Sequence, residues 1–178
     1  VLLVSGGHSE LILMKDHGNF QFLGGTRDDA AGECFDKCAR VLNLGYPGGP
    51  MIEKNAIFKN LSPLPRPMIN TKDFDFSFSG LKTAVLYRKN EDPNGMAFEL
   101  QEAITDVLVK KTLMAADKFK VKNILLAGGV AANKRLEEIM KIMCKDRGAI
   151  FYVVPQEYSG DNGTMIAWSG IIAYKAGQ

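Results

Sequence analysis

Two apolar segments of this chain run directly into paired glycines. "LLVS" is followed by glycines at 6–7, and "NILLA" by glycines at 128–129. A third pair, at 48–49, lies in the proline-rich stretch "GYPGGP". Because glycine has no Cβ atom, its backbone N–H groups can approach an anion closely. Three such pairs favour a nucleotide-binding fold, although tight strand-to-helix turns also need glycine for purely structural reasons.

Other sequence features bear on which kind of nucleotide-binding fold this chain could form. The chain contains neither a Walker motif nor G-x-G-x-x-G, which argues against a P-loop and against a dinucleotide-binding fold. Ser5 adds a hydroxyl donor to the first turn. Asn133 is expected to cap the helix after the 128–129 turn, near the positive end of its dipole.

Hydrophobic periodicity predicts alternating strands and helices. Strands are expected at about 2–5, 10–15, 20–25, 123–127 and 150–154, with the turn "DHGN" joining the second to the third. Helices are expected at about 28–44, 80–88, 95–119, 133–145 and from 161 onwards. Asp28 or Asp29 should cap the first helix, "GYPGGP" should form a loop, and the rest of 51–92 should be irregular. This order of elements indicates an α/β fold.

Composition excludes several classes of protein. With 46% hydrophobic and 24% charged residues the chain should be globular, and no apolar run approaches the ~20 residues of a membrane helix. It opens on an apparent strand without a basic leader, as a fragment would. Cys34, Cys38 and Cys144 lack zinc-site spacing and fit buried thiols in the reducing cytosol. A net charge of +2 does not by itself imply nucleic acid.

Three carboxylates have both a structural and a functional interpretation. Asp36 can form an exposed i,i+4 pair with Arg40, or accept the hydroxyls of a ribose. Glu53, four residues after Gly49, poses the same choice, and a surface carboxylate is favoured there. Asp161 can cap the last helix or ligate iron, magnesium or manganese, and the sequence alone favours the cap.

Two other patterns are weaker. The stretch "SGLK" at 79–82 matches the S-x-x-K signature of serine acyl-enzymes, but the K-T-G element of that group is absent, so we reject it. Basic side chains at 110–122 and at 134–145 could form stripes that contact RNA. Charge on exposed helix faces is usually only solvated, so these stripes remain weak evidence.

Five segments together resemble the tRNA threonylcarbamoyladenosine transferase family, formerly described as O-sialoglycoprotein endopeptidases. They are "LLVSGGHSEL", "DDAAGECFDKCARVLNLGYPGGP", "FSFSGLKTAV", "LAGGVAANKRL" and "GDNGTMIAW", in the family's order over nearly the whole chain. The resemblance implies the actin, Hsp70 and sugar-kinase superfold, with two lobes around a nucleotide cleft. Residues 1–178 would be the C-terminal part, mostly the second lobe, with an irregular and helical insertion at about 51–120 and without the N-terminal lobe.

The resemblance also implies an activity. Members of the family are acyltransferases (N6-L-threonylcarbamoyladenine synthases), which transfer a threonylcarbamoyl group from threonylcarbamoyl-AMP to N6 of the adenosine next to the anticodon in tRNAs that read ANN codons. The expected location is the cytoplasm, without membrane contact. Expected partners are tRNA, the adenylate substrate and, in bacteria, an inactive paralogue and a small ATPase.

The family's functional positions map onto residues of this chain by resemblance. A loop along the phosphate and acyl groups would comprise Leu3, Val4, Ser5, Gly6 and Gly7. The ribose would be faced by Asp36, Gly49 and Glu53. The nucleoside would be bordered by Gly128, Gly129 and Asn133.

The resemblance assigns Asp161 a role other than helix capping. It would ligate a divalent metal ion, iron, together with two histidines of an H-x-x-x-H motif that these 178 residues lack. With one of three protein ligands, this chain alone should bind metal weakly and should not turn over. No side chain in it is identified as a general base.

Two other functions stay open, an ATP-dependent small-molecule kinase of the same superfold and a non-catalytic scaffold paralogue in a tRNA-modification complex. A kinase would not need "GDNGTMIAW" after the last strand. Scaffold paralogues tend to lose the motif residues, whereas Asp36, Asn133 and Asp161 all remain. The protease description is the weakest option, because His8 has no convincing partner.

Overall fold

The computed structural model describes residues 1–160 and 162–177. Its centre is a five-stranded mixed sheet in the order β3-β2-β1-β4-β5. Strands β1 (Leu2–Val4), β2 (Ser9–Asp16) and β3 (Asn19–Gly25) are antiparallel, while β4 (Asn123–Ala127) and β5 (Ile150–Val153) extend the sheet from β1 in parallel. The predicted strands and the turn between β2 and β3 are confirmed, and with them the α/β class.

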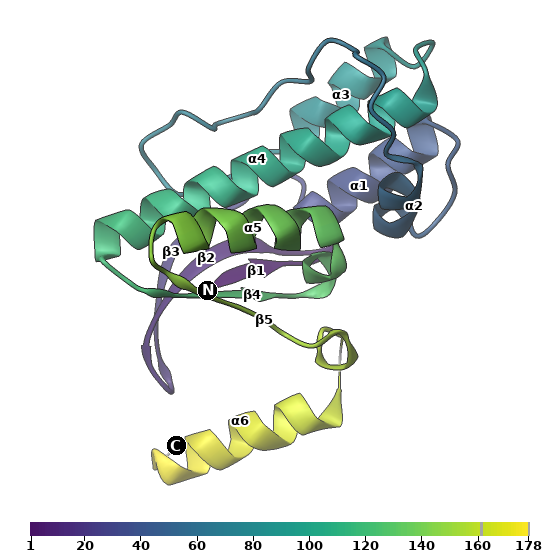
Figure 1. Ribbon diagram of the computed structural model, residues 1–178. Helices are drawn as coiled ribbons and strands as arrows, with labels where there is room; N and C mark the ends of the chain where they lie inside the picture. Colours follow the sequence, from purple (N-terminus) through teal and green to yellow (C-terminus); the bar gives the residue numbers. More distant parts are fainter. Residues whose placement is uncertain (161, 178) are drawn as a thin grey trace.

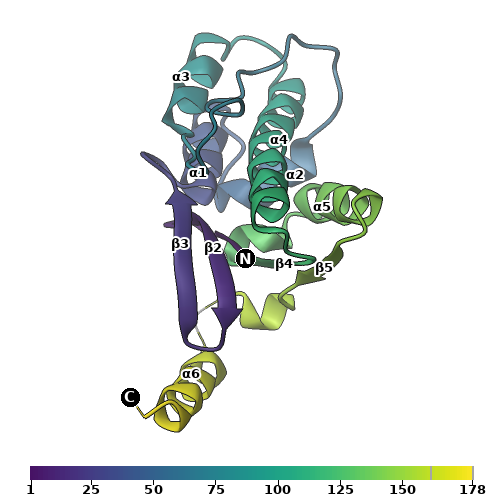
Figure 2. The same cartoon turned by 90° about the vertical axis from the view of Figure 1, so that its left-hand side faces the viewer.

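Helices cover one face of this sheet. In Figures 1 and 2, α1 (Ala31–Val41), α4 (Pro93–Phe119) and α5 (Lys134–Asp146) lie on that face. Helices α2 (Gly48–Asn55) and α3 (Ser79–Tyr87) pack against α1 and α4. Helix α6 (Gly163–Lys175) lies apart, beyond the opposite face of the sheet, and buries no residue. No helix in the described residues is long and apolar enough to cross a membrane.

The long helix α4 holds this arrangement together. It starts at Asp92, whose carboxylate accepts the N–H of Gly95 (2.8 Å), with Pro93 in the first position, where no N–H is needed. Its apolar side chains pack into one continuous core with the inward face of the sheet. Among the fully buried members are Leu100, Ile104 and Leu108. The strand ends that carry the glycine turns are therefore fixed from one side by a rigid helix.

The loop predicted at 45–50 is helical in its second half. The "GYPGGP" stretch runs into α2, with Pro47 as its N-cap and Pro50 in its first turn, where a proline costs no hydrogen bond. A Cβ atom at Gly48 would lie 2.4 Å from the Cα of Asp36, so glycine is what lets α2 approach α1 so closely. The prediction of a loop holds for residues 45–47 and is wrong for 48–50, where the prolines and glycines serve helix initiation and packing.

The predicted caps of the first helix were also wrong. Ala30 is the N-cap of α1, and the N–H of Ala31 donates to the buried Ser9 hydroxyl (2.8 Å). Asp28 instead accepts hydrogen bonds from residues 77–79, including the backbone N–H of Phe78 (2.8 Å) and the Ser79 hydroxyl (2.8 Å). Partial burial raises the pKa of Asp28, but these hydrogen bonds outweigh it and hold that pKa below its ordinary value. Ser79 of the "SGLK" pattern is thus a structural residue.

The cysteines are buried, as predicted. The Sγ atoms of Cys34 and Cys38 lie 3.9 Å apart inside α1, and Cys144 is buried on α5. The hydrogen bond with Cys38, together with burial, raises the pKa of the Cys34 thiol. A thiol in that state is a poor nucleophile, so this pair belongs to the core.

Lys111 gives a stability prediction. It is fully buried on α4, and its ammonium group donates to the Thr71 hydroxyl (2.6 Å) and to the Asp73 carbonyl (2.8 Å), which ties α4 to the segment before α3. We expect Lys111→Met to lower the free energy of unfolding by about 2 kcal/mol, because charge-assisted hydrogen bonds are lost and their acceptors remain. Urea unfolding measures this, with Lys110→Met on the exposed neighbour as control. Equal unfolding midpoints for the two variants would contradict it.

Candidate functional site

The two strand-ending glycine turns meet at one edge of the sheet. Strands β1 and β4 are parallel neighbours, with Leu2 opposite Leu126, so their carboxyl ends lie together. Gly128 has φ +93°, and a Cβ atom there would lie 2.2 Å from the Val4 carbonyl oxygen. Open α/β sheets bind ligands at the carboxyl ends of their strands. This edge is therefore the expected place for a site.

The first turn is held by its own serine. The Ser5 hydroxyl oxygen accepts the N–H groups of Gly7 (3.2 Å) and His8 (3.0 Å), so it fixes the turn in addition to any ligand contact. Leu3 and Val4, predicted to belong to this loop, lie in β1, where the Val4 side chain is buried. The turn thus begins at Ser5. Cβ positions at Gly6 and Gly7 face open space, with no atom within 4 Å.

A cavity of about 220 Å³ lies between this turn, α1, α2 and the start of α5. Six of the predicted site residues line it: Gly6, Asp36, Gly49, Glu53, Gly129 and Asn133. The others, Leu3, Val4, Ser5, Gly7 and Gly128, are outside its lining. The volume is below the ~300–1,000 Å³ of typical whole-ligand pockets. The cavity therefore fits part of a nucleotide rather than all of one.

Sequence reasoning missed the apolar wall of this cavity. Phe35, Val130 and Ala132 line it, together with Gly32, Pro47 and Pro50. The two prolines flank the glycine pair at 48–49, but in the sequence they were interpreted only as loop residues. Phe35 is a core residue, 2% exposed, and also part of the wall.

Of the two interpretations of Asp36, the ion pair with Arg40 does not form. Its Oδ1 atom accepts the N–H of Gly48 (2.7 Å), which fixes α2 against α1, and no ion pair with Arg40 occurs in the part of the chain described. The carboxylate lines the cavity, and its Oδ2 atom has no protein partner among the described residues. One oxygen is therefore structural and the other can accept a hydrogen bond from a ligand.

Glu53 and Asn133 both accept backbone N–H groups from the first turn of α5. The Oε1 atom of Glu53 accepts the N–H of Lys134 (2.7 Å), so Glu53 links two helices rather than standing free on the surface. Asn133 caps α5 as predicted, accepting the N–H of Leu136 (2.9 Å). Its amide also donates to Gln101 (3.0 Å). The Asn133 side chain is thus committed to the fold at the cavity's border.

The predicted metal ligand is not among the residues that the structure describes. Asp161 lies outside residues 1–160 and 162–177. The N-cap of α6 is Asn162, which accepts the N–H of Met165 (2.8 Å). Within those ranges, no three His, Cys, Asp or Glu side chains come together as metal ligands would.

The fold removes one member from each of the two basic stripes that the sequence suggested. Lys111 is buried, and Arg135 donates to Glu102 (2.7 Å) and to Glu138 (3.1 Å). The lysines at 110, 118, 120, 122, 134, 141 and 145 remain exposed, so RNA contact through these segments stays a prediction.

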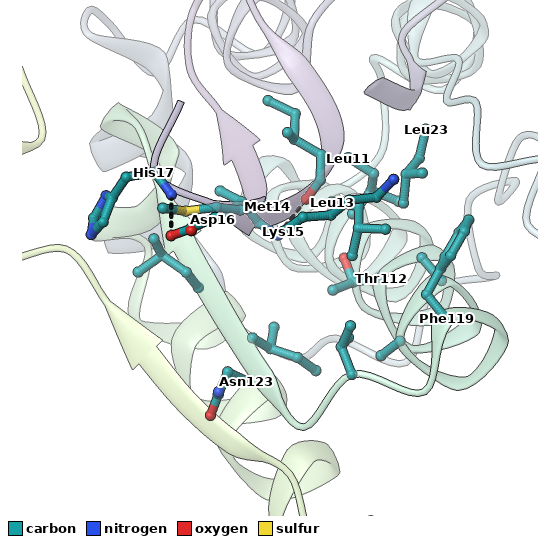
Figure 3. Close-up of a pocket in the computed structure, with 17 residues that line it drawn as sticks. Leu11, Leu13, Met14, Lys15, Asp16, His17, Leu23, Thr112, Phe119 and Asn123 are labelled. Carbon is teal, nitrogen blue, oxygen red and sulfur yellow. Dashed lines mark hydrogen bonds between the residues drawn. The ribbon is translucent and has the colours of Figure 1, made fainter. Parts of the chain in front are cut away.

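A second cavity, of about 300 Å³, lies at the other ends of the same strands (Figure 3). It is bounded by Val1, by the β2–β3 hairpin and by the C-terminal end of α4. Apolar side chains such as Leu13 and Phe119 dominate its lining, with Asp16 and His17 at the hairpin end. It has no glycine turn and lies at the amino ends of β1 and β4, so it is the weaker candidate.

Comparisons with known proteins identify a family for this chain. The family model described as tRNA N6-adenosine threonylcarbamoyltransferase matches residues 1–168. Curated relatives with that name include those of Desulfitobacterium hafniense (49% identity, 97% of this chain, 54% of the relative), Persephonella marina (47%, 98%, 53%) and Geobacillus kaustophilus (46%, 99%, 55%). The chain thus spans about half the length of the curated relatives it matches.

A solved structure, the crystal structure of T. kodakarensis HypF, resembles 89% of this chain over 21% of its own, with a TM-score of 0.64 and 24% identity. That likeness concerns the fold alone. The curated relatives share about twice that sequence identity with this chain, and the family model matches residues 1–168. By them, the chain belongs to the tRNA N6-adenosine threonylcarbamoyltransferase family.

Proposed function

We propose that the cavity between α1, α2 and α5 binds the adenylate part of threonylcarbamoyl-AMP, for transfer of the threonylcarbamoyl group to N6 of the adenosine next to the anticodon in tRNAs that read ANN codons. The observation that carries this proposal is the convergence of six family positions, from four separate segments, on one cavity. These segments are 5–7, α1, the start of α2 and the region around 129–133.

The chemistry of the lining suits a ribose. Asp36 and Glu53 each use one carboxylate oxygen to accept a backbone N–H, at 2.7 Å in both cases. Their second oxygens can accept the ribose hydroxyls, as acidic residues do in other nucleotide sites. Positions 6, 49 and 129 have no atom within 4 Å of an added Cβ, so their glycine backbones border open space where a ligand fits.

The reaction needs few groups from this chain. The adenine N6 attacks the carbamoyl carbon, the bond to the anhydride oxygen breaks, and AMP leaves with the bonding electrons while one amine proton is released. The cavity would hold the leaving AMP in place, which supplies orientation rather than proton transfer. N–H groups of the glycine turns would face the charge that grows on the phosphate.

The proposal includes one divalent metal ion, iron, with Asp161 as a ligand. The described residues contain no complete metal site, so no step above depends on the metal. We expect Asp161→Ala in the full-length protein to reduce bound iron at least tenfold, because loss of a carboxylate ligand weakens a hard-metal site. Elemental analysis after dialysis measures this, with the exposed Asp146→Ala as control. Unchanged iron content in Asp161→Ala would remove the ligand role.

The actin, Hsp70 and sugar-kinase superfold, with an insertion at about 51–120, is part of the same proposal. The mixed sheet, with its glycine turns at one edge, supports it. A kinase of that superfold is the alternative activity, because it would use the same cavity for ATP. Partners of the transferase would be tRNA, an inactive paralogue and a small ATPase, in the cytoplasm.

Mass spectrometry tests the function directly. The full-length protein is incubated with tRNA, threonine, bicarbonate, ATP and an enzyme that makes threonylcarbamoyl-AMP, and the tRNA is then digested. Threonylcarbamoyladenosine that depends on the protein would establish the transferase. No product, even with the paralogue and ATPase added, would point to a scaffold, and ATP consumption with a small-molecule acceptor would point to a kinase.

A further inference from the structure

A second hollow adjoins the nucleotide cavity at Asp36. It has a volume of about 410 Å³ and is lined by Asp36, Arg40, Asn43, Gly45 and Tyr46. Asp36 lines both spaces, so the two meet at this residue. Nothing in the adenylate chemistry above uses the other four residues.

The arginine in this hollow is free for an external anion. Arg40 follows Asp36 by one helical turn, the spacing at which exposed pairs normally form. Asp36 is instead engaged by the N–H of Gly48 (2.7 Å), and Arg40 has no ion pair within the ranges 1–160 and 162–177. An unpaired guanidinium presents a planar set of donors that matches a phosphate group.

The tyrosine supplies a flat surface beside that charge. Tyr46 lies in the short connection between α1 and α2, and it is 80% exposed. Asn43, also exposed and with φ +54°, adds an amide at the end of α1. An aromatic ring, a guanidinium and an amide are the groups that bind single-stranded nucleotides by stacking, by phosphate contact and by hydrogen bonds to a base edge. Tyr46 is the only large apolar side chain in the lining, which disfavours a peptide groove.

We propose that this Arg40–Tyr46 hollow binds one nucleotide of the tRNA substrate, with its base stacked on Tyr46 and its phosphate at Arg40. The inference rests on the proposed function, which makes RNA the acceptor. The shared position of Asp36 places this nucleotide beside the adenylate, where a neighbour of the acceptor adenosine must lie. The hollow thus gives the chain a direct contact with RNA beside the adenylate.

Binding of a fluorescent anticodon stem–loop to the full-length protein tests the stacking. We expect Tyr46→Ala to weaken RNA binding about five- to one-hundredfold, the loss of one stacked base. Tyr46→Phe, which keeps the ring, should stay within about twofold of wild type. Affinity for AMP should not change in either variant. Tyr87→Ala, on an equally exposed ring (85%) of α3, is the matched control and should bind RNA normally.

Salt dependence tests the phosphate contact separately. Arg40→Gln should lower the slope of log affinity against log salt by about one, the loss of one phosphate contact. Lys89→Gln, an exposed cation at the end of α3, should leave the slope unchanged.

The outcomes separate this inference from the function on which it rests. If the wild-type protein modifies tRNA but Tyr46→Ala binds RNA normally, the proposed role of the hollow is wrong and the transferase function stands. Loss of AMP affinity in Tyr46→Ala also overturns it, because the ring would then belong to the adenylate cavity. Wild-type protein that neither binds nor modifies tRNA removes both.

Discussion

Gly128→Ala is expected to lower the free energy of unfolding by about 3 kcal/mol or more. The residue has φ +93°, a backbone conformation that is costly for alanine, and its Cβ atom would lie 2.2 Å from the Val4 carbonyl oxygen and 2.8 Å from the Val4 carbonyl carbon. Val4 cannot retreat, because β1 is hydrogen-bonded on both sides, to β2 and to β4. The strain must therefore be absorbed by separating β4 from β1.

Gly129→Ala is the matched control for this prediction. It changes the adjacent residue in the same way, but no atom lies within 4 Å of the added Cβ. We expect its unfolding midpoint in urea to stay close to that of wild type. Its affinity for AMP should fall instead, since Gly129 lines the cavity. Equal destabilisation of the two variants would show that the turn is sensitive as a whole and that the contact with Val4 is not the cause.

The contrast between Gly128 and Gly129 could not be predicted from the sequence. The pairs at 6–7, 48–49 and 128–129 were interpreted together as groups that approach an anion. The structure divides them: Gly48 and Gly128 are required by backbone contacts with Asp36 and Val4, while Gly49 and Gly129 border the cavity. The two members of a pair look alike in the sequence. Only the neighbours brought in by folding distinguish them.

The strands and long helices were predictable because their signals are local. Hydrophobic periodicity located the strands and α4 to within a few residues. The errors lie where the partner is distant in sequence. Asp28 looked like a cap of α1, but its partners are at 77–79, about fifty residues further on. The start of α2 looked like a loop, because nothing local indicated that Gly48 packs on α1.

The roles of the site residues were likewise predictable only where their hydrogen-bond partners are close in sequence. The resemblance to the family named Asp36 and Glu53, but composition could not separate a surface pair from a ligand contact. Hydrogen bonds to Gly48 and Lys134 fix both carboxylates at the cavity, and both donors come from other elements of the fold. Asn133 was predictable as a cap because capping is local, and the structure confirms that role.

Asp36→Asn is expected to lower affinity for AMP about tenfold or more while leaving the free energy of unfolding close to wild type. The amide oxygen of asparagine can still accept the Gly48 N–H, so the contact between α1 and α2 survives. What is lost is the second, charged acceptor that we assign to a ribose hydroxyl, and hydrogen bonds to charged groups contribute about 1.5–3 kcal/mol. Calorimetric titration with AMP and urea unfolding measure the two effects separately. Glu33→Gln, on the same helix, changes a half-buried carboxylate that pairs with Lys37 and is outside the cavity's lining, and it is the control.

A change of ligand makes the test specific to the ribose. Wild-type protein should bind 2′-deoxy-AMP or 3′-deoxy-AMP more weakly than AMP, whichever hydroxyl faces Asp36. In Asp36→Asn that preference should largely disappear, because protein and ligand changes that remove the same hydrogen bond are not additive. If Asp36→Asn lowers affinity for all three nucleotides by the same factor, Asp36 acts through the position of α2 and not through the ribose. The cavity would then have to recognise the nucleotide through Glu53 and its glycine backbone.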